Sequence, residues 1–219
     1  ALGNAGVRQT QYWAKVQGVV TFMIPRTHWI FIHDDNAGMV VTFADQQFRP
    51  EVGQVIEAEG RLQPGGYTPY IARGQARVLG RAEMPRPKIA DPARLAVGED
   101  YARYVVVRGH VRDLGLGNGY LTLLVSANLR RFPVQVIASK GERLPRHWLD
   151  AEVEITGVCQ STKGASGHPL GFLIYTPSTN RVKILAVGSA SDLWERPLRR
   201  ISELPAVPKG ARVKIAGVV

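Results

Sequence analysis

The chain has 219 residues, with 28 Lys or Arg against 18 Asp or Glu, so its formal net charge is +10 at pH 7. This length allows one or two domains. The excess positive charge suits an anionic partner such as nucleic acid, an anionic glycan or lipid headgroups, although an ordinary solvated basic surface is the interpretation we favour. The single cysteine, Cys159, excludes an intramolecular disulfide framework. No apolar run approaches the roughly 18 residues that a membrane-spanning helix needs.

One strand pattern recurs five times, with β-branched or small apolar residues at every second position around a glycine. The five glycines are Gly18, Gly60, Gly109, Gly157 and Gly217. Self-similarity of this kind indicates tandem modules. Each module begins with one copy and has a second near its middle, whereas the copy at 213–219 stands alone. We therefore predict two complete modules and the opening strand of a third, which we expect to pair with a strand edge.

The first module is predicted to contain five short strands. Alternating apolar residues at 29–33 and 39–43 flank the turn 34–38, which is rich in residues that tolerate positive φ, so these segments form a hairpin. A turn at Gly53 leads into the long strand around Gly60. After a break at 64–66, the segments 70–72 and 76–79 form the closing strand.

The second module repeats this order. Its opening strand around Gly109 leads through a glycine-rich loop at 115–119 into a second strand. The remaining strands are expected at 132–136, 151–158 and 171–175 with 182–185. Between the modules, Asp91 and Pro92 supply a helix N-cap followed by proline at the first helical position. The predicted divisions are a first barrel with an N-terminal arm at 1–85, a connector with a short helix at 86–104, a second barrel at 105–190, a second such connector at 191–211, and the third module's strand at 212–219.

Five short strands, an opening strand that bends at a glycine and a glycine-rich closure describe a small Greek-key barrel. The oligonucleotide/oligosaccharide-binding (OB) fold fits this pattern, because its long first strand curls to join both halves of the barrel and glycine permits the bend. We therefore predict an all-β chain of two tandem five-stranded OB-like barrels with short helical connectors. A β-sandwich is the alternative.

Residues that could support catalysis are few. The five histidines show no metal-ligand spacing, and Cys159 has no cysteine partner. Asp34 and Asp35 open a hairpin turn, where aspartate caps backbone amides. The loop 115–119 lacks the lysine and the following helix of a phosphate-binding loop. The sequence therefore predicts no catalytic residue, no metal site and no cofactor.

A candidate binding face lies in the first module. Trp29, Phe31 and His33 alternate with core-type isoleucines and therefore share one face of a strand. With Arg26 and His28 just before them, they place aromatic rings beside cationic groups, as in proteins that grip single-stranded nucleic acid. Sugars also stack on exposed aromatic rings. The alternative is that Trp29 and Phe31 pack against the other module or against Tyr12 and Trp13. The equivalent strand of the second module, 120–125, has no such face.

Further segments of both modules match a known pattern. They are 18–21, 34–38, 50–60, 69–71 and 78–80 in the first module and 149–153, 157–159, 171–178 and 197–201 in the second. Together these segments resemble the N-terminal extracytoplasmic region of bacterial sensor histidine kinases, in which tandem barrels precede a membrane helix and a kinase core. The kinase's phosphoacceptor histidine and ATP-binding motifs are absent from this chain. The resemblance implies a sensory or scaffolding ectodomain and does not identify its ligand.

The leading hypothesis is a non-enzymatic, ligand- or partner-sensing ectodomain of a two-component system on the periplasmic side of a bacterial membrane. Its partner would be an unknown ligand or protein, with a homodimer as one option, and it would touch a membrane only through segments outside this chain. The alternatives are a cytoplasmic protein that binds single-stranded nucleic acid and a glycan-binding module.

Overall fold

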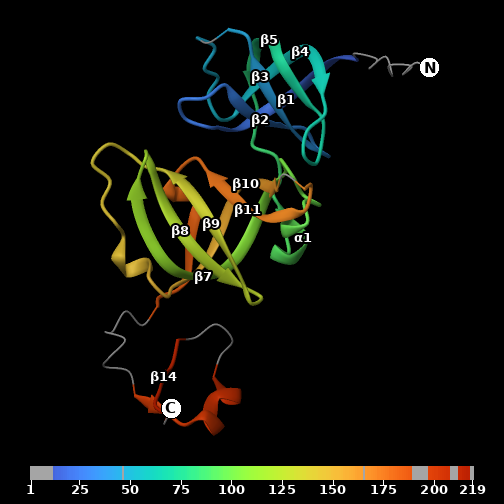
Figure 1. Ribbon diagram of the computed structural model, residues 1–219. Coiled ribbons are helices and arrows are strands. Elements are labelled where there is room, and N and C mark those ends of the chain that lie inside the picture. Colours follow the sequence, from blue (N-terminus) through green and yellow to red (C-terminus); the bar gives the residue numbers. More distant parts are fainter. Residues whose placement is uncertain (1–11, 46, 165, 189–196, 208–211, 218–219) are drawn as a thin grey trace, which may run out of the picture. The chain divides into compact units, whose positions relative to one another are not determined.

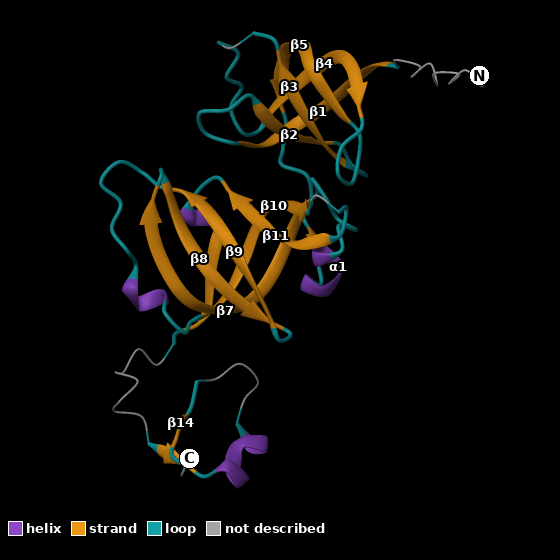
Figure 2. Cartoon of the chain, in the orientation of Figure 1, coloured by secondary structure: helices purple, strands orange, loops and turns teal. Residues whose placement is uncertain are grey.

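A computed structural model describes residues 12–45, 47–164, 166–188, 197–207 and 212–217. The chain divides into two compact units, Ala1–Pro85 and Arg86–Val219. Strands dominate both units and helices are few and short (Figures 1 and 2). The chain is therefore all-β, as the alternation in the sequence predicts.

The first unit is a closed five-stranded barrel. Its strands are β1 (Trp13–Met23), β2 (Trp29–His33), β3 (Gly38–Phe43), β4 (Gln54–Gln63) and β5 (Tyr70–Arg81). The strand order is β1-β2-β3-β5-β4, and β4 pairs back onto β1. Only the β3–β5 pair is parallel. Because β1 pairs with β2 on one side and β4 on the other, it belongs to both halves of the barrel. This is the OB-like Greek key, and the β-sandwich alternative is wrong.

The second unit repeats this connectivity. Its barrel strands are β7 (Tyr104–Gly117), β8 (Tyr120–Ala127), β9 (Arg130–Ile137), β10 (Glu152–Lys163) and β11 (Pro169–Thr176). The order is β7-β8-β9-β11-β10, and β10 pairs back onto β7. Two short strands extend the sheet, with β6 (Lys88–Ile89) beside β7 and β12 (Val182–Ala186) beside β10. A 3-10 turn, Thr179–Arg181, separates β11 from β12.

Each barrel has its own apolar core. In the first, Ile30, Ile56 and Ile71 are fully buried, and Phe48 from the loop before β4 packs edge-on against Phe43 at 4.9 Å. The second core gathers the inward residues of its five strands together with Trp148, which lies in the 3-10 turn Arg146–Trp148 ahead of β10. In both units an aromatic residue between the third and fourth strands therefore packs against the barrel interior.

Four of the five recurring glycines, all except Gly217, lie where a neighbouring strand leaves little or no room for a side chain. A Cβ at Gly157 would lie 2.3 Å from the Tyr175 carbonyl oxygen, and one at Gly60 would lie 2.9 Å from the Cα of Gly74. Only a residue without a side chain fits at such distances. Each barrel therefore needs one such glycine in its first strand and one in its fourth, and this need explains the two copies of the pattern in each module.

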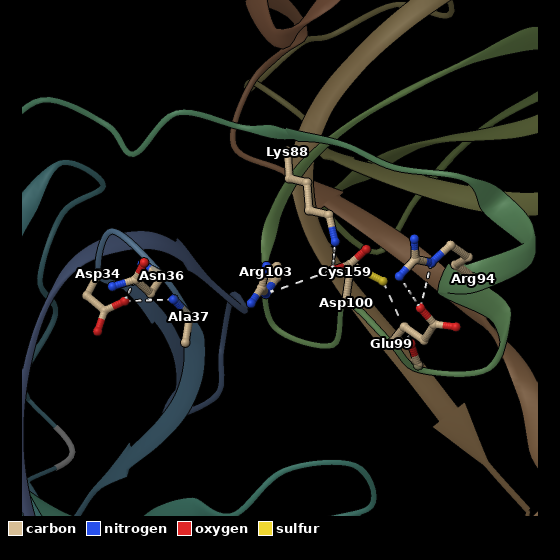
Figure 3. A network of polar contacts seen from close by, with 10 residues as sticks. Asp34, Asn36, Ala37, Lys88, Arg94, Glu99, Asp100, Arg103 and Cys159 are labelled. Atoms are coloured by element: carbon tan, nitrogen blue, oxygen red, sulfur yellow. Dashed lines mark hydrogen bonds and ion pairs between the residues drawn. The ribbon is translucent and has the colours of Figure 1, made fainter.

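The connector between the modules belongs to the second unit. Helix α1 (Pro92–Ala96) begins at Asp91, whose side chain accepts a hydrogen bond from the Ala93 amide at 2.9 Å, and its Leu95 is fully buried in the second core. Asp100, only 3% exposed, accepts from Lys88 Nζ at 2.7 Å and lies 3.8 Å from Arg103 Nε (Figure 3). Leu95 thus anchors the connector on the barrel core, and the contacts of Asp100 join residues within the connector.

One detail differs from the sequence prediction. Strand β7 continues through Gly117 into the stretch 115–119, which we expected to be a loop, and β8 begins at Tyr120, so that only Asn118 and Gly119 remain as the turn. Both have positive φ, 55° and 82°, as a tight two-residue hairpin turn requires. The segments 70–72 and 76–79 form one closing strand, β5, as predicted, with an irregularity in its pairing to β3 between Ile71 and Gly74.

The last described segment, 212–217, forms a strand pairing of only two residues on each strand. Strand β14 (Lys214–Ile215) pairs in parallel with β13 (Leu198–Arg199), and the 3-10 helix Ile201–Ala206 follows β13. Arg212 lies 2.9 Å from the Asp150 carboxylate and donates to the Arg112 carbonyl. Asp150 also pairs with Arg112 at 2.8 Å, and both side chains are buried. The segment is therefore tied to the second barrel through a buried carboxylate.

The crowding at Gly157 can be tested by substitution, with Gly115 as a matched control. We expect Gly157→Ala to lower the free energy of unfolding by about 1–3 kcal/mol, because the new methyl group overlaps the Tyr175 carbonyl. At Gly115 nothing lies within 4 Å of an added Cβ, so Gly115→Ala should change stability by less than about 1 kcal/mol. Urea denaturation of both variants checks this expectation, and equal losses would contradict it.

Candidate ligand-binding face

The candidate face begins at the turn between β1 and β2. The Ile24 amide donates to the Trp29 carbonyl at 3.0 Å, and the Thr27 hydroxyl donates to the Ile24 carbonyl at 2.9 Å. The Trp29 amide in turn donates to Thr27 Oγ1 at 3.2 Å. Arg26 sits in this turn with φ of +62° and an exposed side chain. The closed hydrogen bonding of the turn fixes Arg26 directly beside the start of β2.

The centre of the face is a pair of stacked rings. Trp29, at the start of β2, stacks on Tyr70, at the start of β5, with centroids 5.8 Å apart and planes 18° from parallel. The strand between them contributes Thr42, whose position pairs with Trp29. Trp29 remains 39% exposed. The result is a partly exposed pair of stacked aromatic rings at one end of three neighbouring strands.

A second cationic residue borders this surface. Arg73 follows Tyr70 closely in β5 and has φ of +49°, a left-handed conformation at the irregularity in the β3–β5 pairing. Its amide donates to Thr42 Oγ1 at 3.0 Å, and that hydroxyl lies 3.4 Å from the Ile71 carbonyl. Its side chain is exposed. The Thr42 hydroxyl thus holds the bend that brings Arg73 beside the ring pair.

The five residues predicted from the sequence do not all lie on this face. Arg26 and Trp29 are exposed on it, and His28 is half-buried beside them. Phe31 is fully buried, with its ring 6.5 Å from that of Phe22, and His33 is 6% exposed. The predicted alternation holds, since the isoleucines of β2 enter the core. A binding role for the five residues stays a prediction, but only the first three are accessible in this structure.

Sequence reasoning missed Tyr70 and Arg73. Trp29 stacks on Tyr70, and neither Tyr12 nor Trp13 takes that place. Tyr70 could have been found from the predicted topology, because the third and fifth strands of an OB-like barrel are parallel neighbours. Their pairing lets the residue that opens the fifth strand reach the second strand across the third.

The second barrel has no equivalent ring pair. Gly18 and Gly109 occupy the same place, and the pairing irregularity that follows each of them is the same. Counting from these glycines, Thr122 takes the position of Trp29. Leu173 takes the position of Tyr70, because the next residues, Ile174 and Ile71, contact the equivalent glycines Gly157 and Gly60. An open groove of about 510 Å³ lies beside it, lined in part by Arg130, Arg131 and Phe172. The groove lacks a stacked aromatic pair among its lining residues.

The thiol of Cys159 is one side chain that could act as a nucleophile. Cys159 is buried, and burial raises the pKa of its thiol to about 12, so the thiolate needed for nucleophilic attack does not form near neutral pH. Within the described ranges no cluster of three potential metal ligands occurs. The same ranges contain no helix long and apolar enough to cross a membrane.

The comparisons with known proteins are sparse. No protein-family model and no curated protein matches the chain. Among solved structures, an aspartyl-tRNA synthetase from Entamoeba histolytica is 14% identical with a TM-score of 0.37, over 47% of this chain and 22% of that one. A murine DNA-binding protein bound to double-stranded DNA is 8% identical with a TM-score of 0.36, over 81% and 97%. The Ifi202 HINa domain in complex with double-stranded DNA is 11% identical with a TM-score of 0.34, over 81% and 98%. At these TM-scores the likeness carries no argument about what this chain binds.

The turn after β2 yields a pH-dependent prediction. Asp34 accepts hydrogen bonds from the amides of Asn36 and Ala37, each at 2.7 Å (Figure 3). The Ala37 and Asn36 amides, in that order of effect, lower the pKa of Asp34 below its ordinary 3.8. The stabilisation is therefore present above the unfolded-state pKa and is lost as the pH falls through the lower folded-state pKa.

We expect Asp34→Ala to cost about 0.5–1 kcal/mol at pH 7 and progressively less below pH about 4, because protonation removes the same interaction in the wild type. Asp34→Asn keeps an acceptor for both amides without the titrating charge, and its loss should vary less with pH. Thermal unfolding followed from pH 2 to 7 measures both variants. A constant difference between wild type and Asp34→Ala at every pH would contradict the assignment.

Proposed function

We propose that the chain acts by binding rather than by catalysis, and that its first barrel binds single-stranded nucleic acid on the Trp29–Tyr70 ring pair. The observation that carries the proposal is the stack itself, a partly exposed ring pair built from β2 and β5. Aromatic surfaces of this kind accept unpaired bases, because every base has a face on which to stack. OB folds commonly bind oligonucleotides at the second and third strands and the loops beside them.

Charge supports the same ligand. Arg26 flanks the stacked rings from the turn before β2 and Arg73 from the irregular part of β5, and the chain as a whole carries a net charge of +10. A groove or face that combines cations with stacking rings holds the phosphate backbone and the bases together. Duplex DNA offers no free base faces, so a single strand fits the ring pair better than a duplex does.

A glycan is the second candidate, since the same exposed rings suit a sugar. The two ligands differ in electrostatics, because a neutral sugar releases no counterions on binding whereas each neutralised phosphate does. The sensing role, the periplasmic location and the homodimer remain predictions from the sequence. A sensing ectodomain would also need a ligand site, and the ring pair is the site we propose in either setting.

We expect oligothymidylate to bind the wild-type chain with an affinity that falls steeply with salt, because the backbone contacts release counterions. Trp29→Ala should weaken binding by about 5- to 150-fold, the equivalent of losing one stacked base at roughly 1–3 kcal/mol. Fluorescence anisotropy at 50 and 200 mM salt measures both effects. Leu129→Ala is the control, since Leu129 is a fully exposed apolar residue of the second barrel.

An absence of binding at 50 mM salt would remove the nucleic-acid proposal. If a soluble glycan binds with little salt dependence and Trp29→Ala abolishes that binding, the glycan takes its place. If Leu129→Ala weakens oligothymidylate binding as much as Trp29→Ala does, the ligand lies on the second barrel instead.

A further inference from the structure

A row of side chains runs across all five strands of the first barrel. The pairings join Trp29 on β2 to Thr42 on β3, and Arg61 on β4 both to Ala72 on β5 and to Trp13 on β1. The amide of the next residue in β5, Arg73, donates to the Thr42 hydroxyl at 3.0 Å and closes the gap between β3 and β5. From end to end, the row consists of Trp29, Thr42, Ala72, Arg61 and Trp13.

Every member of this row points away from the barrel interior. Side chains alternate along a strand, and a chain neighbour of each member packs inward. The inward neighbours are Ile30, Val41, Ile71, Leu62 and Ala14, all of which belong to the first core or pack against it. The row is therefore one continuous outer surface. Four strand spacings of about 4.8 Å give it a length of roughly 19 Å.

The far end of the row repeats the chemistry of the near end. Trp13 is 68% exposed, the largest exposed aromatic surface among the described residues. Its cross-strand neighbour is Arg61, so a ring again lies beside a cation. The pairing of β1 with β4 alone would be satisfied by any strand-forming residue, so packing does not account for a tryptophan that leaves most of its side chain in solvent.

Arg61 in the row and Arg73 beside it differ from other cationic residues of the barrel. Within the part of the chain that the structure describes, neither Arg61 nor Arg73 has an ion-pair partner. By contrast, Arg77 and Lys15 both lie 3.0 Å from the carboxylate of Glu57, which is four residues before Arg61 on β4. Glu59 is the acidic side chain that faces outward between them and Arg61. The nearest carboxylate on β4, that of Glu59, therefore lies to one side of the row. The row itself contains only positively charged and neutral side chains.

We propose that a single strand of nucleic acid lies along the whole row, with one base on the Trp29–Tyr70 pair, another on Trp13, and phosphates at Arg61 and Arg73 between them. The inference rests on the proposed function and adds a second anchor, a direction across the strands and a minimum ligand length. A strand too short to reach both anchors would gain from only one of them.

Two oligothymidylates test the second anchor, one of about 3 nucleotides and one of about 12, within the roughly 4–16 nucleotides that one OB fold covers. Trp13→Ala should weaken the longer one by about 5- to 150-fold and the shorter one by less than about threefold. Trp29→Ala should weaken both. Trp13 is mostly exposed, so Trp13→Ala is expected to keep the wild-type melting temperature, and thermal unfolding checks that it does.

The salt dependence tests the phosphate contact. Arg61→Ala should lower the slope of log Kd against log salt by about 0.7 for the longer oligonucleotide, the value for one phosphate on a single strand. Arg108→Ala removes the same charge from β7 of the second barrel, where Arg108 lies 2.7 Å from Glu154. That control should leave the slope unchanged.

The outcomes separate the two proposals. If Trp29→Ala weakens the longer oligonucleotide and Trp13→Ala does not, the second anchor is wrong and the proposed function stands. If the wild type binds neither oligonucleotide at low salt, both are wrong. Equal changes of slope in Arg61→Ala and Arg108→Ala would mean that net charge, not the row, attracts the strand, and would overturn the phosphate contact.

Discussion

The fold depends on one steric constraint, the close approach of two strands in each barrel where only glycine fits. At Gly157 a methyl group would lie 2.3 Å from a carbonyl oxygen, and at Gly60 it would meet the backbone of β5. Because the fourth strand can come this close to the fifth, the first strand can pair with both the second and the fourth and close the barrel. The same closure sets the pairing register. It thereby decides which side chains share a row on the outer surface, and the candidate site follows from it.

Much of this architecture can be predicted from the sequence, because its determinants are local. Alternating apolar residues in β2 and β3 and the Asp34 turn predict the hairpin, and Asp91 with Pro92 predicts the start of α1. The repeated glycines predict two modules of the same kind. The extent of β7 and β8 was not predictable in this way, because glycine is common both in loops and in the two-residue turn at Asn118 and Gly119.

The site was predicted less completely, and the reason is long-range pairing. Trp29 is conspicuous as an aromatic residue on an alternating strand, but Tyr70 joins it only through the parallel pairing of β3 and β5. Trp13 and Arg61 fall into the same row through pairings of β1 with β4, almost fifty residues apart in the chain. Phe31 shares a face with Trp29 by alternation, yet it is buried against Phe22. Alternation gives the face of a strand, and it does not tell whether that face meets solvent.

We propose that the chain binds its ligand on the outer row of the first barrel. Backbone amide NMR of the whole chain during titration with an oligothymidylate of about 12 nucleotides locates the binding surface, because the amides of each strand in both barrels report separately. We predict shifts that concentrate at Arg26, Trp29, Tyr70, Arg73, Arg61 and Trp13, with the indole signals of both tryptophans moving together. Shifts that concentrate instead in the second barrel, or none at low salt, would contradict the claim.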